Sequence, residues 1–133
     1  LFKDSIFDSA IEERVISKEI NDLILEMLVK TVNSPKGTAA KAKLTEKIVA
    51  GKTGTAQVYS LDAGKSDKKQ LQDHALFISY APYENPEIIV TVIVEHGGGG
   101  STTAAPIARN IIDFYMKRKT QKVSMHDWLF RNK

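Results

Sequence analysis

The sequence predicts an α+β fold, in which the strands of an antiparallel sheet are packed by helices. Three features predict it. Apolar residues recur at intervals of three and four between positions 20 and 32, as on one face of a helix. Two strand-like runs, 74–81 and 87–95, are separated by only five residues, which indicates an antiparallel hairpin. A chain of 133 residues, 42% of them hydrophobic, is long enough to bury one modest core.

The first predicted element is a helix that begins after Ser17, a residue type whose hydroxyl commonly caps helix N-termini. A proline and a glycine within residues 33–37 end the periodic pattern and begin a loop. The loop continues through 38–40 and crosses to the sheet. The predicted apolar face of the helix consists of Ile20, Leu23, Ile24, Met27, Leu28 and Val32.

The next predicted element is a strand over residues 47–59. An apolar, β-branched run approaches Lys52-Thr53-Gly54-Thr55 and continues beyond it as strand. Gly54 weakens a strand, and a glycine there usually marks a place where a ligand or another backbone comes close. A surface edge strand with ordinary threonines is the alternative interpretation, and this tetrapeptide alone does not decide between the two.

A polar segment, 60–73, predicts an exposed connection with a short helical turn at 68–72. The following strand, 74–81, alternates between two faces. The run 87–95 is nearly continuous in β-branched residues, which is typical of a central strand. Together these runs predict at least three strands. The two faces of 74–81 consist of Leu76, Ile78 and Tyr80 on one side and Ala75, Phe77 and Ser79 on the other.

The last predicted element is a helix over 104–117 that folds back onto the sheet. Glycines at 97–100 allow a tight loop from sheet to helix, and Pro106 lies in the first helical turn, where its missing N–H is harmless. We expect one domain over 1–117 and a basic C-terminal tail over 118–133. The predicted inward face of the helix consists of Ala104, Ile107, Ala108, Ile111 and Tyr115, with Ile112 and Phe114 at its margins.

Composition excludes several classes of function. There is no cysteine, so disulfides and cysteine-based sites are excluded, and no apolar run is long enough to span a bilayer. The net charge of +3 is mild, and a solvated tail explains it. Trp128 and Phe130 are too few and too closely spaced for a stacking platform, so we expect no nucleic acid partner.

The sequence lacks the motifs of nucleotide and metal sites. Gly51-Lys52-Thr53 looks like the end of a phosphate-binding loop, but Glu46 stands where that loop needs its first glycine. The glycine run 97–100 lacks the last glycine of a dinucleotide fingerprint. The three histidines, His74, His96 and His126, form no compact ligand pair, so no metal is expected.

Acyl transfer by an active serine fits the tetrapeptide better. Lys52-Thr53-Gly54 matches the third signature of the penicillin-recognising serine acyltransferases. A substrate that ends in a free carboxylate needs a cation and hydroxyl donors, which Lys52, Thr53 and Thr55 supply. Gly54 lets the substrate lie flush along the strand, and a backbone N–H there can stabilise the oxyanion of the tetrahedral intermediate.

The match extends well beyond three residues. Over roughly residues 17–117, the chain resembles the C-terminal part of the transpeptidase domain of class B penicillin-binding proteins, and in particular the penicillin-binding protein 2 type that serves cell elongation. The resemblance rests on the runs PKGTA at 35–39, IVAGKTGTAQ at 48–57, HALF at 74–77, YAP at 80–82 and EHGG at 95–98.

The resemblance implies a fold and a set of roles. The family's fold is a five-stranded antiparallel sheet between helical groups, so this chain would carry an incomplete portion of it, with its last three strands. Lys52 would provide a positive field and a hydrogen bond near the nucleophilic serine. Thr53 and Thr55 would bind the terminal carboxylate of a D-Ala-D-Ala stem peptide or of a β-lactam. Gly54 would lie beneath the substrate, and the N–H of Thr55 would join the oxyanion hole.

The chain departs from the family pattern in its other two signatures. It contains no S-x-N triplet, and its single S-x-x-K, at 66–69, lies after Lys52 in a charged segment. We therefore expect the nucleophile upstream of Leu1 and no transpeptidase activity from this fragment alone. We also expect it to self-associate through an open sheet edge on the side of strand 47–59.

The resemblance further implies a setting for the full-length protein. It would act at the periplasmic face of the bacterial inner membrane, with an anchor outside this fragment, beside the proteins of the cell-elongation machinery. Two alternatives stay open. The chain could belong to a β-lactamase-type or penicillin-sensing relative, which shares the Lys-Thr-Gly strand, or it could be a non-catalytic binding module whose basic tail contacts a membrane or a partner.

Overall fold

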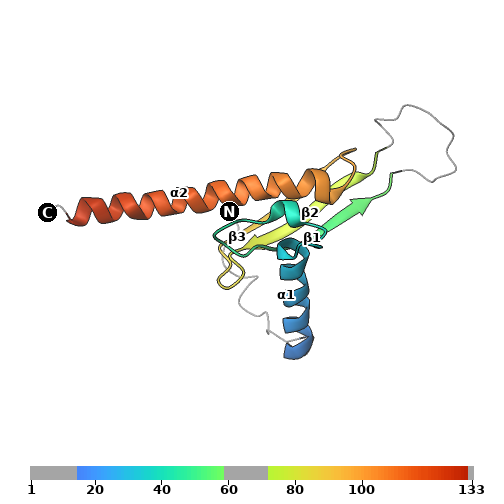
Figure 1. Ribbon diagram of the computed structural model, residues 1–133, viewed down its shortest axis with the longest axis horizontal. Coiled ribbons are helices and arrows are strands. Elements are labelled where there is room, and N and C mark those ends of the chain that lie inside the picture. The colour runs from blue at the N-terminus through green and yellow to red at the C-terminus, as the bar shows by residue number, and fades with distance from the viewer. Residues whose placement is uncertain (1–14, 59–71, 132–133) are drawn as a thin grey trace, which may run out of the picture.

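The computed structural model of the chain describes residues 15–58 and 72–131, with side chains up to residue 120. Two helices, a three-stranded sheet and two short helical turns make up the described chain (Figure 1), and the predicted α+β class is confirmed. The predicted connection 60–73, its helical turn and the S-x-x-K at 66–69 lie largely or wholly outside the described residues. In order, the elements are α1 Lys18–Asn33, η1 Ala40–Ala42, β1 Ala50–Ala56, β2 His74–Ala81, β3 Ile88–Val94, η2 Gly100–Ala104 and α2 Ala105–Arg131.

The sheet is antiparallel throughout, with the strand order β1-β2-β3. The predicted hairpin between β2 and β3 is confirmed. β1 is shorter than the predicted 47–59, because its pairing ends where Ala56 meets His74, the first residue of β2. Within the described sheet, β1 and β3 are both edges. The prediction that 87–95 is a central strand is therefore wrong for this part of the chain.

The exposure of β3 explains that error. Val90 and Val92 are buried, whereas Ile89 and Ile93, on the opposite face, are 73% and 64% exposed. The β-branched run therefore fills the core on one face only. On the other face, nothing among the described residues covers the isoleucines.

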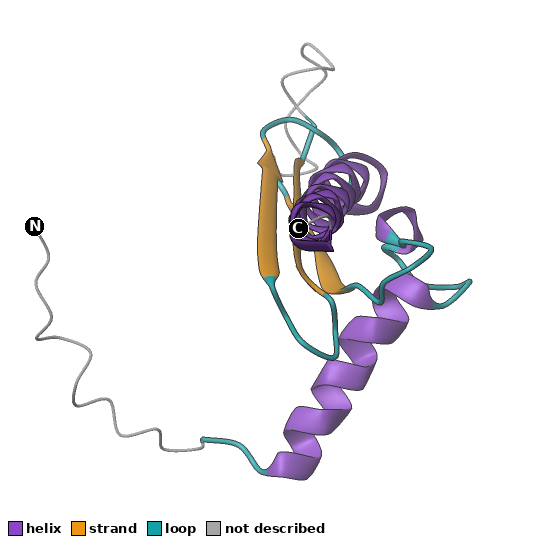
Figure 2. Ribbon diagram, turned by 90° about the vertical axis from the view of Figure 1, so that its left-hand side faces the viewer, coloured by secondary structure: helices purple, strands orange, loops and turns teal. Residues whose placement is uncertain are grey.

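The core lies between one face of the sheet and α2 (Figure 2). The predicted alternation of β2 is confirmed, since Ala75, Phe77 and Ser79 are all buried. Ser79, the buried polar residue of this face, donates its hydroxyl hydrogen bond to the carbonyl oxygen of Val90 over 3.3 Å. This bond satisfies a group that would otherwise destabilise the core.

The predicted inward face of the last helix is partly wrong. Ala104 and Ala108 are buried as expected, but Ile112, predicted at the margin, is fully buried. The other large residues of the predicted face, Ile107, Ile111 and Tyr115, are between 38% and 44% exposed. The small alanines allow the helix to lie close to the sheet, which turns the bulkier isoleucines at 107 and 111 towards the surface.

α2 is longer than predicted. The expected helix ends at residue 117, but α2 continues through Arg131 and runs past the end of the sheet (Figure 1). No glycine or proline follows Pro106 within it, so the sequence contains no residue that would stop the helix. Ion pairs on its surface join Lys117 to Asp113 and Lys119 to Glu87, each over 2.7 Å.

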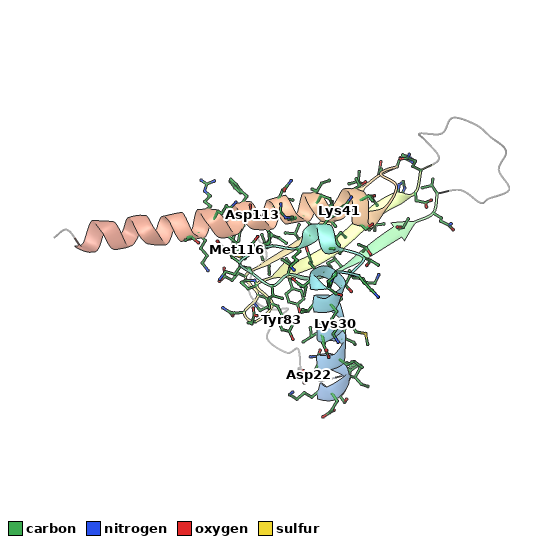
Figure 3. All side chains as sticks on the ribbon, in the orientation of Figure 1. Asp22, Lys30, Lys41, Tyr83, Asp113 and Met116 are labelled. Carbon is green, nitrogen blue, oxygen red and sulfur yellow. The ribbon has the colours of Figure 1, made fainter. Side chains whose placement is uncertain are left out.

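α1 matches its predicted bounds but not its predicted burial. The Ser17 hydroxyl accepts the Ile20 N–H over 3.3 Å, as a cap should. Val32 is buried, but the rest of the predicted apolar face is exposed or half-buried. α1 meets β1 only at its C-terminal end and points away from the sheet, so that Asp22 lies on its projecting half (Figure 3). The exposed members are Ile20, Leu23, Ile24 and Met27, each between 43% and 52% exposed.

Candidate functional site

The Lys-Thr-Gly-Thr segment occupies the middle and end of β1, at an edge of the described sheet. Successive side chains of a strand point to opposite faces. Lys52 pairs with Ile78 on the exposed face, and Thr53 pairs with the buried Phe77 on the α2 face. The cation and the hydroxyls therefore lie on the two faces of one strand. Both faces meet at the edge of β1 that has no strand partner in the described sheet.

Lys52 is exposed, and its side chain is held along the strand. Its Nζ donates a hydrogen bond to the carbonyl oxygen of Thr53 over 2.8 Å. The ammonium group therefore stays beside the hydroxyl residue that follows it in sequence. A cation that is already held in place binds an anionic ligand at a lower cost in side-chain entropy.

Thr53 contacts a residue from a distant part of the chain. Its Oγ1 lies 3.3 Å from the Oγ1 of Thr38, and either hydroxyl can be the donor. Thr38 belongs to the PKGTA loop, which is held against α1 by a hydrogen bond from the Ala39 N–H to the carbonyl oxygen of Thr31 over 3.0 Å. Both runs carry the family resemblance, but their separation along the sequence gives no sign that their hydroxyls meet.

A second contact ties α1 to the start of β1. The Asn33 side chain donates through Nδ2 to the carbonyl oxygen of Val49 over 2.7 Å, and also to that of Val29 over 2.8 Å. One amide therefore links the end of the helix to the strand. This link fixes the position of the loop that carries Thr38.

Gly54 and Thr55 complete the segment. Thr55 is exposed and pairs with Ala75. Gly54 has no side chain to project from the exposed face of β1. A Cβ at this position would lie 3.2 Å from the Cβ of Leu76. On the other face, the backbone of Gly100 packs against Gly54. The close approach predicted for Gly54 is therefore observed, as an approach by another backbone.

The hairpin brings two of the three histidines together. The rings of His74 and His96 meet edge to face with centroids 4.9 Å apart, and the His96 N–H donates to Nδ1 of His74 over 3.0 Å. Sequence spacing did not reveal this pair, because it depends on the strand register. No group of three or more possible ligands comes together among the side chains that the structure describes. The side chain of His126 lies outside them.

A groove of about 540 Å³ lies away from Lys52, between the loop 44–47, the turn after β2, and α2. Its charged groups are mostly occupied. Asp113 and Lys119 form the ion pairs already described, and Nε of Arg109 donates to the carbonyl oxygen of Lys43 over 3.0 Å. The hydrogen bond that the Lys119 ammonium donates to the Glu87 carboxylate raises the pKa of Lys119 above its usual value. Because these charged side chains already have partners, they do not converge on a ligand in the groove. The groove is therefore a poor candidate for a catalytic site.

Neither helix of the described chain has the length and apolar character required to cross a bilayer.

Comparison with known proteins gives a consistent result. Residues 3–113 match the family described as the Penicillin binding protein transpeptidase domain. A curated relative, the peptidoglycan D,D-transpeptidase MrdA of Haemophilus influenzae, is 44% identical over 102 residues, which cover 72% of this chain and 16% of that protein. The chain thus spans about a sixth of the length of that relative.

Two solved structures show the same fold. The structure of Pseudomonas aeruginosa PBP2 in complex with WCK 5153 matches with a TM-score of 0.62 and 35% identity, over 77% of this chain and 21% of that one. PBP2 of Helicobacter pylori, solved in a complex with MreC, matches with a TM-score of 0.53 and 31% identity, over 67% of this chain and 16% of that one.

Proposed function

Because the chain belongs to the penicillin-binding protein transpeptidase domain family, we propose that it carries the substrate-binding strand of a peptidoglycan D,D-transpeptidase. The proposed subtype is the one that serves cell elongation. The observation that carries the proposal is the placement of Lys52, Thr53 and Thr55 on both faces of an accessible edge strand. The proposed nucleophile is a serine outside these 133 residues.

The proposed substrate is a stem peptide that ends in D-Ala-D-Ala, or a β-lactam in its place. The hydroxyls of Thr53 and Thr55 bind its terminal carboxylate. Lys52 adds a positive charge beside them, and hydrogen bonds to an ionised carboxylate are about twice as strong as neutral ones. Thr38, whose hydroxyl meets that of Thr53, orients the latter for this bond.

Chemistry follows when the serine hydroxyl attacks the carbonyl carbon of the penultimate D-Ala. The N–H of Thr55 stabilises the oxyanion that forms. The intermediate then releases the terminal D-Ala, whose amine takes up a proton, and leaves an acyl-enzyme. The amine of a second stem peptide then attacks the acyl-enzyme, which forms the cross-link and frees the serine. In this scheme Gly54 keeps the strand flat enough for the substrate to lie along it.

The proposed setting is the periplasmic face of the bacterial inner membrane. Helicobacter pylori PBP2 has been solved with MreC, which supports proteins of the elongation machinery as partners here. The relatives are transpeptidases, which favours this reaction over a β-lactamase-type or penicillin-sensing role for the same strand. No cofactor enters the scheme.

We also propose that the isolated chain associates through its open sheet edges. β1 and β3 both lie at edges of the described sheet, and β3 exposes Ile89 and Ile93. β3 has no charged residue or proline along its length, and such an edge readily pairs with another strand, whereas Lys52 lies within β1. In the full-length protein, further strands of the same domain would take this place.

Labelling with a fluorescent penicillin tests the proposed function. We expect the full-length protein to form a covalent adduct and residues 1–133 to form none, because the proposed serine lies outside them. A full-length protein that takes up no label would contradict the assignment and favour a non-catalytic binding module. A label on residues 1–133 alone would refute the proposed location of the nucleophile.

A further inference from the structure

The turn that follows β3 is held in a fixed shape beside the candidate site. It crosses the end of the sheet to reach η2 and α2 (Figure 2). The Gly98 N–H donates to the carbonyl oxygen of Asp73 over 2.8 Å, and the Thr103 hydroxyl donates to that of Gly97 over 2.7 Å. His96 adopts a positive φ of 51°. The turn is therefore bound to the start of β2 at one end and to η2 at the other.

Gly100, where the turn enters η2, touches the middle of β1. A Cβ at this position would lie 2.4 Å from the carbonyl oxygen of Gly54 and 2.3 Å from that of Leu76. Both atoms belong to the backbone, so neither can move aside without a shift of its strand. The preceding residue differs, since a Cβ at Gly99 would meet only the hydroxyl of Thr102, at 3.0 Å.

We propose that Gly100 is a positioning residue for the carboxylate-binding strand, acting through the backbone of Gly54. The inference rests on the proposed function of that strand. β1 is paired on one side only within the described sheet, so the contact from Gly100 helps to set its height above the core. Gly54 lies between Thr53 and Thr55, and a shift of its peptide displaces both of their donors. Hydrogen bonds weaken steeply with such displacement.

His74 also helps to hold the turn that carries Gly100 in place. Its Nδ1 accepts the His96 N–H, so that nitrogen carries no proton and the turn is anchored to β2 through the ring. The tautomer follows from this donor. Removal of the acceptor takes away one of the bonds that hold this end of the turn, beside that from the Gly98 N–H to Asp73 and the contact of His96 Nδ1 with the carbonyl oxygen of Gln72, and so loosens the packing of Gly100 on Gly54. An asparagine at position 74 keeps an acceptor, whereas a phenylalanine keeps only the ring.

The test compares acylation of the full-length protein by a β-lactam free acid and by its methyl ester. The ratio of the two second-order rate constants measures recognition of the carboxylate. It does not depend on the fraction of folded protein, so a merely structural defect leaves it unchanged. We expect Gly100→Ala to lower this ratio about tenfold to a hundredfold, the loss for one hydrogen bond to a charged group. Gly99→Ala, at an extended backbone position that alanine readily adopts, should keep it.

The outcomes separate the two claims. A wild-type ratio in Gly100→Ala overturns the inference and leaves the proposed function intact. A wild-type protein that does not distinguish acid from ester overturns the proposed function, and the inference falls with it. If Gly100→Ala does not fold, His74→Phe and His74→Asn test the inference instead. We expect His74→Phe to lower the acid-to-ester ratio and His74→Asn to keep it. Equal, wild-type ratios for both would refute the inference.

Discussion

Phe77 and Ile78 are consecutive residues of β2 whose side chains point to opposite faces of the sheet, and so they form a matched pair of stability probes. Phe77 is 1% exposed and packs between the sheet and α2, whereas Ile78 is 53% exposed. Phe77→Ala removes a buried aromatic ring and leaves a cavity. Such changes cost about 3–5 kcal/mol in the free energy of unfolding. Ile78→Ala, which opens no cavity, should cost about 1 kcal/mol.

Urea unfolding of the 133-residue chain, followed by circular dichroism, measures both changes. With an m-value of about 1.5 kcal/mol/M, Phe77→Ala lowers the midpoint by about 2–3 M, or unfolds the chain before urea is added. Ile78→Ala shifts the midpoint by less than about 1 M. Similar shifts for the two variants would refute the placement of the core on the α2 face.

Three further predictions concern the loop before β1, the open edge of β3 and an ion pair on α2. Gly37→Ala should lower the melting temperature, because its Cβ would lie 2.3 Å from the carbonyl oxygen of Thr31, and an unchanged melting temperature would contradict that packing. Ile89→Lys should shift sedimenting species towards monomer, since a lysine blocks edge pairing, and continued association would exclude the edge of β3. The hydrogen bond to Glu87 raises the pKa of Lys119 above 10.5 in the folded protein. The ion pair therefore stabilises the fold fully below pH 10.5, and this stabilisation is lost as the pH rises through the folded pKa. Glu87→Gln should lower the pKa in an NMR titration, and an unaltered value would exclude the pair.

Local patterns predicted most of the elements. Alternation along β2 correctly separated its buried and exposed residues, and Ser17 correctly marked the start of α1. These features depend on neighbours in sequence. Patterns of this kind say which faces an element has, but they do not say what lies against each face.

The errors arise where packing decides the outcome. Beside the correctly predicted Ala108, α2 turns Ile112 inwards rather than Ile107 and Ile111, because the small side chain of Ala108 brings the helix close to the sheet. The order of the strands follows from their pairing over long range, so the β-branched character of β3 alone could not show that it lies at an edge.

The candidate site was identified from its residue types, but its surroundings were not. Lys52-Thr53-Gly54-Thr55 carries a chemical signature that can be read directly. The hydroxyl of Thr38, the backbone of Gly100 and the ring of His74 reach the strand or its supports through the fold. None of these contacts follows from the spacing of the residues along the chain.

The most direct test of the central claim is the rate at which penicillin acylates the full-length protein when Lys52 is replaced. Lys52→Ala removes the cation from the proposed carboxylate wall, and Lys41→Ala removes an exposed lysine on η1 as its control. We expect acylation to fall by about a hundredfold or more in Lys52→Ala, in line with the loss of a preorganised electrostatic group, and to remain unchanged in Lys41→Ala. Equal rates for Lys52→Ala and the wild-type protein would contradict the role assigned to this strand.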